Sequence, residues 1–410
     1  MSLARFPLRA VTLLVYAGFL AYQSLGSGGA WACGGDVLSV GARIPRTDFL
    51  ANAVAYVPLG ILGMVAAGAR TTRRRYLAWY GLIVLCGITA FSAAMEALQS
   101  CQPARVSSIY DVVSNTAGGS IGVLAGWVME SLALARSRAA SDVLVVETAA
   151  VRAHQRLWIL TLAIGLVWVA SQTLPWTFSA DVGGVRANLS FLRRWQGVSA
   201  LDVWIVLGHA AAWSAIGCAA HLLSPRRLPA AAIMVAFAGL SLGAQLLTTT
   251  RAPISFEELL GLTAAACLTA PLLTLEDGGA RRATAATVLF VAALSTVTAY
   301  ELRPEPAAST TARFFWWPGV GIGGMRGALD YAMLFGWCGL ATIVAAAWHR
   351  RSRRLLAWPI AAVIVTLALE ALQTYVPGRT GDLSAPTFTL LGILVARACL
   401  GDPGPEARNT

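Results

Sequence analysis

The 410-residue sequence has few charged residues and no lysine at all. Charged residues make up 12% of the chain and hydrophobic residues 57%, whereas about a quarter of the residues are charged in soluble domains. This composition excludes an ordinary soluble domain and indicates a polytopic membrane protein. The net charge of +11 comes entirely from arginines that lie in short clusters between apolar runs. Such clusters favour membrane orientation over nucleic-acid binding.

Several signatures of metal and phosphate chemistry are also missing. No histidine is followed by glutamate, which excludes an HExxH zinc motif, and a chain without lysine cannot contain the GxxxxGK phosphate loop. No CxxC pair or Cys/His spacing predicts a metal site, so we expect neither metal nor cofactor. Most of the seven cysteines lie in apolar runs and are typical of small core residues. Cys33 and Cys101 differ, because both fall on the side expected to face outward and can pair.

Apolar runs of bilayer-spanning length, about 17–25 residues, recur through the whole sequence. The first follows Arg5 and Arg9 and extends to about Leu25, and we interpret it as a retained helix rather than a cleaved signal peptide. The other runs cover roughly residues 49–69, 76–99, 109–129, 157–178, 203–223, 228–249, 258–275, 284–300, 328–348, 355–376 and 385–400. The sequence thus predicts an all-α, polytopic membrane helical bundle of about twelve transmembrane helices.

The arginine distribution predicts the orientation of this bundle. With an even number of helices both termini lie on one side, and the loops of that side carry most of the arginines. The densest clusters fall in residues 70–75, 226–227 and 350–354. Because positively charged loops stay in the cytoplasm, we expect a multi-pass protein of the cytoplasmic membrane with both termini cytoplasmic.

Polar residues gather where the third and fourth predicted helices meet, in residues 91–126. Glu96 and Gln99 lie three residues apart and therefore share one helical face. On the predicted topology this stretch lies at the outer membrane boundary, and the second predicted helix begins at the same boundary. The polar residues that can converge there are Asp48, Asn52, Glu96, Gln99, Arg105, Asp111 and Asn115.

The same pattern returns twice in weaker form and predicts an internal repeat. An arginine follows a glutamine by six residues in three pairs, which are Gln99 and Arg105, Gln245 and Arg251, and Gln373 and Arg379. Asp202 and Asp330 each precede the glutamine of their pair by 43 residues. We therefore expect three four-helix parallel repeats, with residues 1–130 best preserved, 150–280 degenerate and 281–410 partly preserved. Leu242 stands where the glutamate would be in the second repeat, whereas the third keeps Glu370.

The first repeat resembles a known family. The segment from Asp48 through Asn52 to Pro58-Leu59-Gly60, together with the polar residues of 91–126, is similar to the VanZ-like family of bacterial membrane proteins. The resemblance covers residues 8–130 well, and it implies a four-helix membrane module and an association with low-level resistance to the glycopeptide teicoplanin. It implies no particular reaction.

These residues predict ligand binding at the membrane boundary. A guanidinium binds phosphates and carboxylates bidentately, so Arg105 and its neighbours suit an anionic membrane lipid or a lipid-linked envelope precursor. Glu96 and Asp111 are also candidate catalytic groups for an enzyme acting on lipid or isoprenoid-phosphate headgroups, and transport is a third class. A purely structural ion pair between Glu96 and Arg105 is the alternative to all three. A secondary ligand-binding set consists of Glu370, Gln373 and Arg379.

Three glycines of the fourth predicted helix, Gly118, Gly122 and Gly126, recur every four residues. Small residues at this spacing let transmembrane helices approach closely. We expect them to pack against a neighbouring helix rather than to bind a ligand.

Overall fold

The computed structural model describes the chain in segments separated by gaps. The described residues are 5–25, 33, 38–39, 46–68, 74–102, 106–139, 161–162, 164–173, 177–178, 181–193, 201–223, 227–249, 254–304, 314–315, 336, 338–342, 344–345 and 357–400. The chain divides into two compact units. The first comprises Met1–Ile159, Ile322–Ala328 and Arg397–Thr410, and the second comprises Leu160–Gly321 and Leu329–Ala396.

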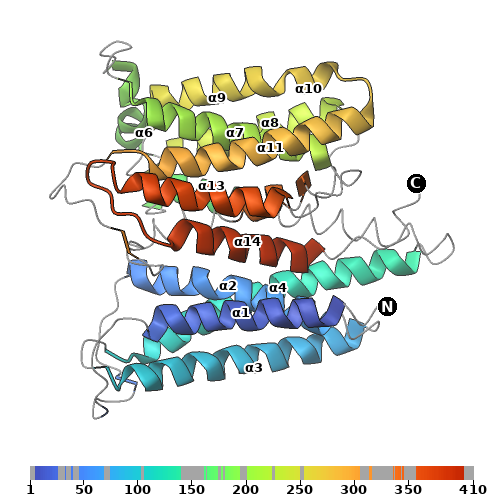
Figure 1. Ribbon diagram of the computed structural model, residues 1–410, viewed down its shortest axis with the longest axis vertical. Helices are drawn as coiled ribbons and strands as arrows, with labels where there is room; N and C mark the ends of the chain where they lie inside the picture. Colours follow the sequence, from blue (N-terminus) through green and yellow to red (C-terminus); the bar gives the residue numbers. More distant parts are fainter. Residues whose placement is uncertain are drawn as a thin grey trace. The chain divides into compact units, whose positions relative to one another are not determined.

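Four helices make up the described part of the first unit (Figure 1). They are α1 (Arg5–Leu25), α2 (Arg46–Gly68), α3 (Arg74–Gln99) and α4 (Ile109–Ala139). All four predicted helices of the first repeat are therefore present, and α4 continues beyond the predicted run. A buried cluster of Leu20, Tyr56, Leu59 and Ile88 joins α1, α2 and α3.

The second unit contains helices and one small pair of strands. Its elements are β1 (Thr177–Phe178), α6 (Val182–Asn188), the 3-10 helix η1 (Ser190–Arg193), α7 (Val203–Leu223), α8 (Arg227–Leu246), β2 (Thr248–Thr249), α9 (Phe256–Thr269), α10 (Pro271–Thr274), α11 (Gly278–Glu301), α13 (Ala357–Gln373) and α14 (Ser384–Leu400). Helix is also described within two further predicted runs, at residues 161–162 and 164–172 and at residues 336, 338–342 and 344–345. The first of these runs was expected to extend to residue 178, but its last two residues form β1 instead. β1 pairs with β2 in an antiparallel sense.

Six helices in the described segments are long and apolar enough to cross a membrane. They are Phe49–Ala67, Tyr76–Gln99, Ile109–Leu132, Val203–Leu223, Phe256–Thr274 and Gly278–Glu301. The apolar helices Ala230–Leu246, Ala357–Gln373 and Ser384–Cys399 are shorter. The chain is thus a multi-pass membrane protein, but neither the expected twelve transmembrane helices nor the three-repeat architecture is confirmed. The reason is that several predicted runs form helices below spanning length or lie partly outside the described residues.

Glycines let α2 and α4 pack backbone against backbone. A Cβ atom at Gly118 would overlap the carbonyl group of Ala53, and one at Gly122 would overlap the carbonyl oxygen of Val57. One turn further along, a Cβ at Gly126 would lie 2.6 Å from the Cβ of Met64. The predicted packing role of the three glycines is confirmed.

Close contacts of the same kind occur within the second unit. A Cβ at Gly261 of α9 would lie 2.6 Å from the Cβ of His209 and 2.8 Å from the backbone nitrogen of Ala210, both in α7. A Cβ at Gly339 would overlap the backbone of Gly392 in α14. Small residues therefore bring helices together at several places in the chain.

Replacing Gly122 by leucine should separate α2 from α4. We expect Gly122→Leu to lower the free energy of unfolding by about 1–3 kcal/mol, the usual effect of overpacking, in thermal unfolding of the detergent-solubilised protein followed by tryptophan fluorescence. The matched control is Gly87→Leu on the exposed face of α3, where a Cβ would meet no atom within 4 Å. Equal stability of the two variants would contradict the close contact of α2 and α4.

Candidate functional site

In the first unit, α1 and α3 end where α2 and α4 begin, and we call this region the polar end. A disulfide and a pair of hydrogen bonds connect its loops. Cys33 and Cys101 form a disulfide, as the sequence allowed. Near the other end of the same segment, the backbone N–H of Ser39 donates to the carbonyl oxygen of Ser107 at 3.1 Å, and the Ser39 hydroxyl donates to it at 2.8 Å. The segment that precedes α2 is therefore fastened to the loop between α3 and α4.

Two glutamines bind the end of α1. Gln99 donates from its side-chain amide to the carbonyl oxygen of Ser24 at 3.0 Å, and Gln102 donates to that of Leu25 at 2.8 Å. The last four carbonyl groups of a helix have no partner within the helix. The predicted site residue Gln99 thus satisfies a helix end.

Glu96 joins the end of α3 to the start of α4. Its side chain is 3% exposed, and its Oε2 accepts the backbone N–H of Ser108 at 2.9 Å. The hydroxyl of Ser108 in turn accepts the backbone N–H of Tyr110 at 3.2 Å. Since the first N–H groups of a helix also need partners, Glu96 helps to hold the beginning of α4.

A second contact joins α2 to α4 at the same end. Asn52 donates from Nδ2 to Oδ1 of Asp111 at 2.7 Å, and both residues are half-buried. Asp111 lies in the first turn of α4, where the helix dipole favours a negative charge. The structure therefore brings together these two predicted site residues.

One turn further along these helices lies a set of buried polar side chains. Asn115 donates from Nδ2 to the hydroxyl of Ser92 at 2.9 Å. The hydroxyl of Tyr56 lies beside Ser92 and interacts electrostatically with Glu96 and Asp111. Sequence reasoning missed Tyr56 and Ser92. A signal for both was present, because each lies four residues from a predicted polar residue of its own helix and therefore on the same face.

Two predicted site residues, Asp48 and Arg105, lie wholly or partly outside the described residues. Asp48 lies within α2, but its side chain is outside the described residues, and Arg105 is outside them altogether. The expected contact of Arg105 with neighbouring carboxylates stays a prediction.

Glu370 makes a contact in the second unit that matches the contact of Glu96. It is 2% exposed, its Oε2 accepts the backbone N–H of Asp382 at 2.9 Å, and its Oε1 accepts that of Ala385 at 2.8 Å. Asp382 follows Glu370 by 12 residues, as Ser108 follows Glu96 by 12 residues. Glu370 thus holds the start of α14 as Glu96 holds the start of α4.

The other two residues of the secondary set bind the end of α11. Gln373 donates from Nε2 to Oε2 of Glu301, a buried carboxylate that sequence reasoning missed. Arg379 donates from Nη2 to the carbonyl oxygen of Tyr300 at 2.8 Å and from Nε to that of Arg303 at 3.0 Å. A cation at this position also complements the negative end of the helix dipole.

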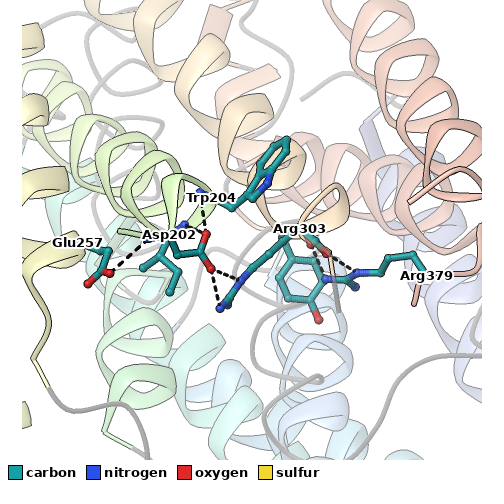
Figure 2. Close-up of polar contacts among 7 residues, drawn as sticks. Asp202, Trp204, Glu257, Arg303 and Arg379 are labelled. Carbon is teal, nitrogen blue, oxygen red and sulfur yellow. Dashed lines mark hydrogen bonds and ion pairs between the residues drawn. The ribbon is translucent and has the colours of Figure 1, made fainter. Parts of the chain in front are cut away.

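A chain of polar contacts joins four helix ends of the second unit. Figure 2 shows Arg303 between Asp202 and Arg379. Arg303 forms an ion pair with Asp202, with Nη2 and Oδ2 3.0 Å apart and side chains that are 46% and 33% exposed. Asp202 also accepts the backbone N–H of Trp204 at 2.9 Å, and so caps α7, while its own N–H donates to Glu257 at 3.4 Å.

Gln245, the glutamine of the expected second repeat, has a different kind of partner. Gln245 donates from Nε2 to Oε1 of Glu258 at 2.8 Å, and both side chains are buried. The predicted neighbour Arg251 lies outside the described residues.

Across the described segments, no group of three or more histidine, cysteine, aspartate or glutamate side chains could hold a metal ion.

The part of the chain that contains the polar end matches a known protein family. Residues 11–130 match the family model described as VanZ/LLP1. The resemblance to the VanZ-like family is thus confirmed over these residues. No curated protein and no solved structure matches the chain.

Removing the Arg379 guanidinium should destabilise the second unit. We expect Arg379→Gln to lower the free energy of unfolding by about 1.5–3 kcal/mol, because charged hydrogen bonds to two helix-end carbonyls are lost. Arg186→Gln is the matched control, since Arg186 is exposed on α6. Thermal unfolding of the two purified variants checks this prediction, and an Arg379→Gln protein as stable as the control would contradict it.

Proposed function

We propose that the VanZ-type segment binds an anionic lipid, or another anionic component of the cell envelope, at the outer face of the cytoplasmic membrane. The observation that carries this proposal is the polar end of the first unit, where Asn52 and Asp111 meet half-buried on two apolar helices. Polar and ionisable groups in membrane-spanning helices are costly and are usually kept for function. Arg105, in the adjoining loop, is the proposed ligand of the anionic group.

The proposed ligand-binding residues are those of the first repeat. They are Asp48, Asn52, Glu96, Gln99, Arg105, Asp111 and Asn115. In this proposal Glu96 and Gln99 act chiefly through the helix ends that they hold. A role in low-level glycopeptide resistance is proposed on the family match of residues 11–130 alone.

Two observations support an outward-facing polar end. Disulfides persist in oxidising compartments outside the cytoplasm, and the disulfide between Cys33 and Cys101 lies at this end. The arginine clusters 70–75, 226–227 and 350–354 occur in loops on the opposite side of the predicted topology. Both observations support an orientation with cytoplasmic termini.

Matching contacts support a repeat between the first and third four-helix segments. A glutamate accepts a backbone N–H 12 residues later in both segments. A parallel bridge before the last helix also occurs in both, between Ser39 and Ser108 and between Phe314 and Gly381. We therefore propose that residues 281–410 are a second copy of the module in which the polar set is reduced.

Binding is favoured over catalysis by the contact of Glu96. Its buried carboxylate accepts a backbone N–H at a helix start, and a carboxylate engaged in this way is poorly available as an acid or base. A lipid- or isoprenoid-phosphate enzyme using Glu96 and Asp111 is therefore the second candidate. Transport comes third, since the polar groups lie at helix ends rather than at the middle of the membrane.

The proposed orientation predicts which loops face the cytoplasm. Reporter fusions after Arg75, Arg227 and Arg354 should be active only as cytoplasmic reporters, because arginine-rich loops are retained there. A fusion near Gln102 should be active only as an exported reporter. Opposite results at two of these sites would reverse the proposed orientation.

The proposed role of Arg105 predicts a loss of ligand without a loss of fold. Arg105→Gln should remove copurifying anionic lipid, measured by mass spectrometry, and change the free energy of unfolding by only about 0–1 kcal/mol, as for an exposed ion pair. Arg186→Gln serves as the control for the loss of one positive charge. Loss of folded Arg105→Gln protein would instead identify Arg105 as part of a structural ion pair.

A further inference from the structure

Comparison of the first and third repeats separates two groups of contacts. In both repeats a glutamate holds the start of a helix and a glutamine reaches the end of the first helix. These contacts hold the helices in place in either repeat. A second group of polar residues, here called the polar seam, is complete only in the first repeat and consists of Asn52, Tyr56, Ser92, Asp111 and Asn115.

The third repeat has replaced the seam residues of α3 and α4. Counted from the matched glutamates, the positions of Ser92, Asp111 and Asn115 correspond to Thr366, Ala385 and Thr389. Thr366 donates to the carbonyl oxygen of Ala362 within its own helix. The third repeat thus keeps hydroxyl groups at two of these positions and lacks the carboxylate and the amide. The complete seam is not needed to build such a module, and the presence of Asp111 and Asn115 in the first repeat needs another explanation.

The floor of the seam contains polar groups whose hydrogen-bonding capacity is not used up. Asn115 is 6% exposed, and its Oδ1 accepts no hydrogen bond. Tyr56 is 4% exposed, and apart from the neighbouring Ser92 its hydroxyl has no hydrogen-bond partner. Both groups lie beside Ser92. Buried amide and hydroxyl groups normally find a partner, because leaving them unpaired lowers stability.

The hydrogen-bonding chemistry of the Asn115 amide and the Tyr56 hydroxyl indicates which kind of ligand group fits between them. An ester or phosphate oxygen only accepts, so it cannot serve the amide oxygen of Asn115. An ammonium group can donate to both oxygens, but it cannot accept the proton of the Tyr56 hydroxyl and it fits only one orientation of the Asn115 amide. A hydroxyl can donate to Asn115 and accept from Tyr56. It also matches the other orientation of the Asn115 amide, in which Nδ2 is the open group.

We propose, building on the proposed function of this end, that the polar seam binds the hydroxyl groups of a polyol headgroup on an anionic lipid, as in phosphatidylglycerol. The half-buried pair of Asn52 and Asp111 forms the mouth of the site, and Tyr56 and Asn115 form its floor. In this proposal the headgroup enters on the side of α2 and α4 that faces α3, beside Ser92, while the acyl chains stay in the bilayer.

The test titrates the full-length protein in detergent with dioctanoyl phosphatidylglycerol, phosphatidic acid and phosphatidylethanolamine, and follows tryptophan fluorescence. We expect phosphatidylglycerol to bind at least about tenfold more tightly than phosphatidic acid, which lacks the polyol. Tyr56→Phe and Asn115→Leu should abolish this preference and leave residual binding of both anionic lipids. Because Tyr56→Phe removes a single oxygen atom, this variant still tests the lipid preference if Asn115→Leu fails to fold.

The matched control is Tyr16→Phe, which removes a hydroxyl that donates to the carbonyl oxygen of Ala55 at 2.9 Å. It should lower stability and keep the lipid preference. Equal affinity for the two anionic lipids, unchanged in Tyr56→Phe, would overturn the hydroxyl site and leave anionic-lipid binding standing. Tighter binding of phosphatidylethanolamine would identify an ammonium occupant and overturn the proposal. If neither anionic lipid binds, both the proposed function and the hydroxyl site are overturned.

Discussion

The need of helix ends for hydrogen-bond partners governs the polar chemistry of this chain. Backbone groups at the ends of apolar helices cannot be left without partners inside a protein or a membrane. Gln99 and Gln102 serve the end of α1, and Arg379 serves the end of α11. Glu96 and Glu370 serve the starts of α4 and α14. These five charged and amide groups of an apolar sequence are therefore explained by the backbone groups that they satisfy.

The positions of the helices could be predicted from the sequence, because apolar runs and small residues act through local periodicity. The packing role of Gly118 followed from its spacing alone. The partners of polar side chains could not be predicted in the same way, since they depend on which helix ends meet. Glu96 was predicted to bind a ligand, to act in catalysis or to pair with Arg105, and its contact with a backbone N–H was not foreseen. Glu301 was missed because the sequence does not show that it lies beside Gln373. The predicted number of spans is not confirmed for another reason, because several predicted runs form apolar helices below spanning length or lie partly outside the described residues.

The close contact of α2 and α4 also determines what the polar residues can do. Backbone contact at Gly118 and Gly122 leaves no space for side chains between these helices. The helices are consequently close enough at the polar end of the first unit for Asn52 to reach Asp111 at 2.7 Å. On the side that faces α3, the polar groups of Tyr56 and Asn115 lie next to Ser92. The glycine contact and the polar seam thus lie on two sides of the same helix pair.

The disulfide has a topological consequence. Cys33 and Cys101 are 68 residues apart, and the chain between them contains both α2 and α3. Their bond closes this part of the chain into a covalent ring, from which α1 and α4 leave as two tails. A single peptide-bond cleavage anywhere within the ring leaves the protein in one piece until it is reduced. The same cleavage outside the ring releases a fragment at once.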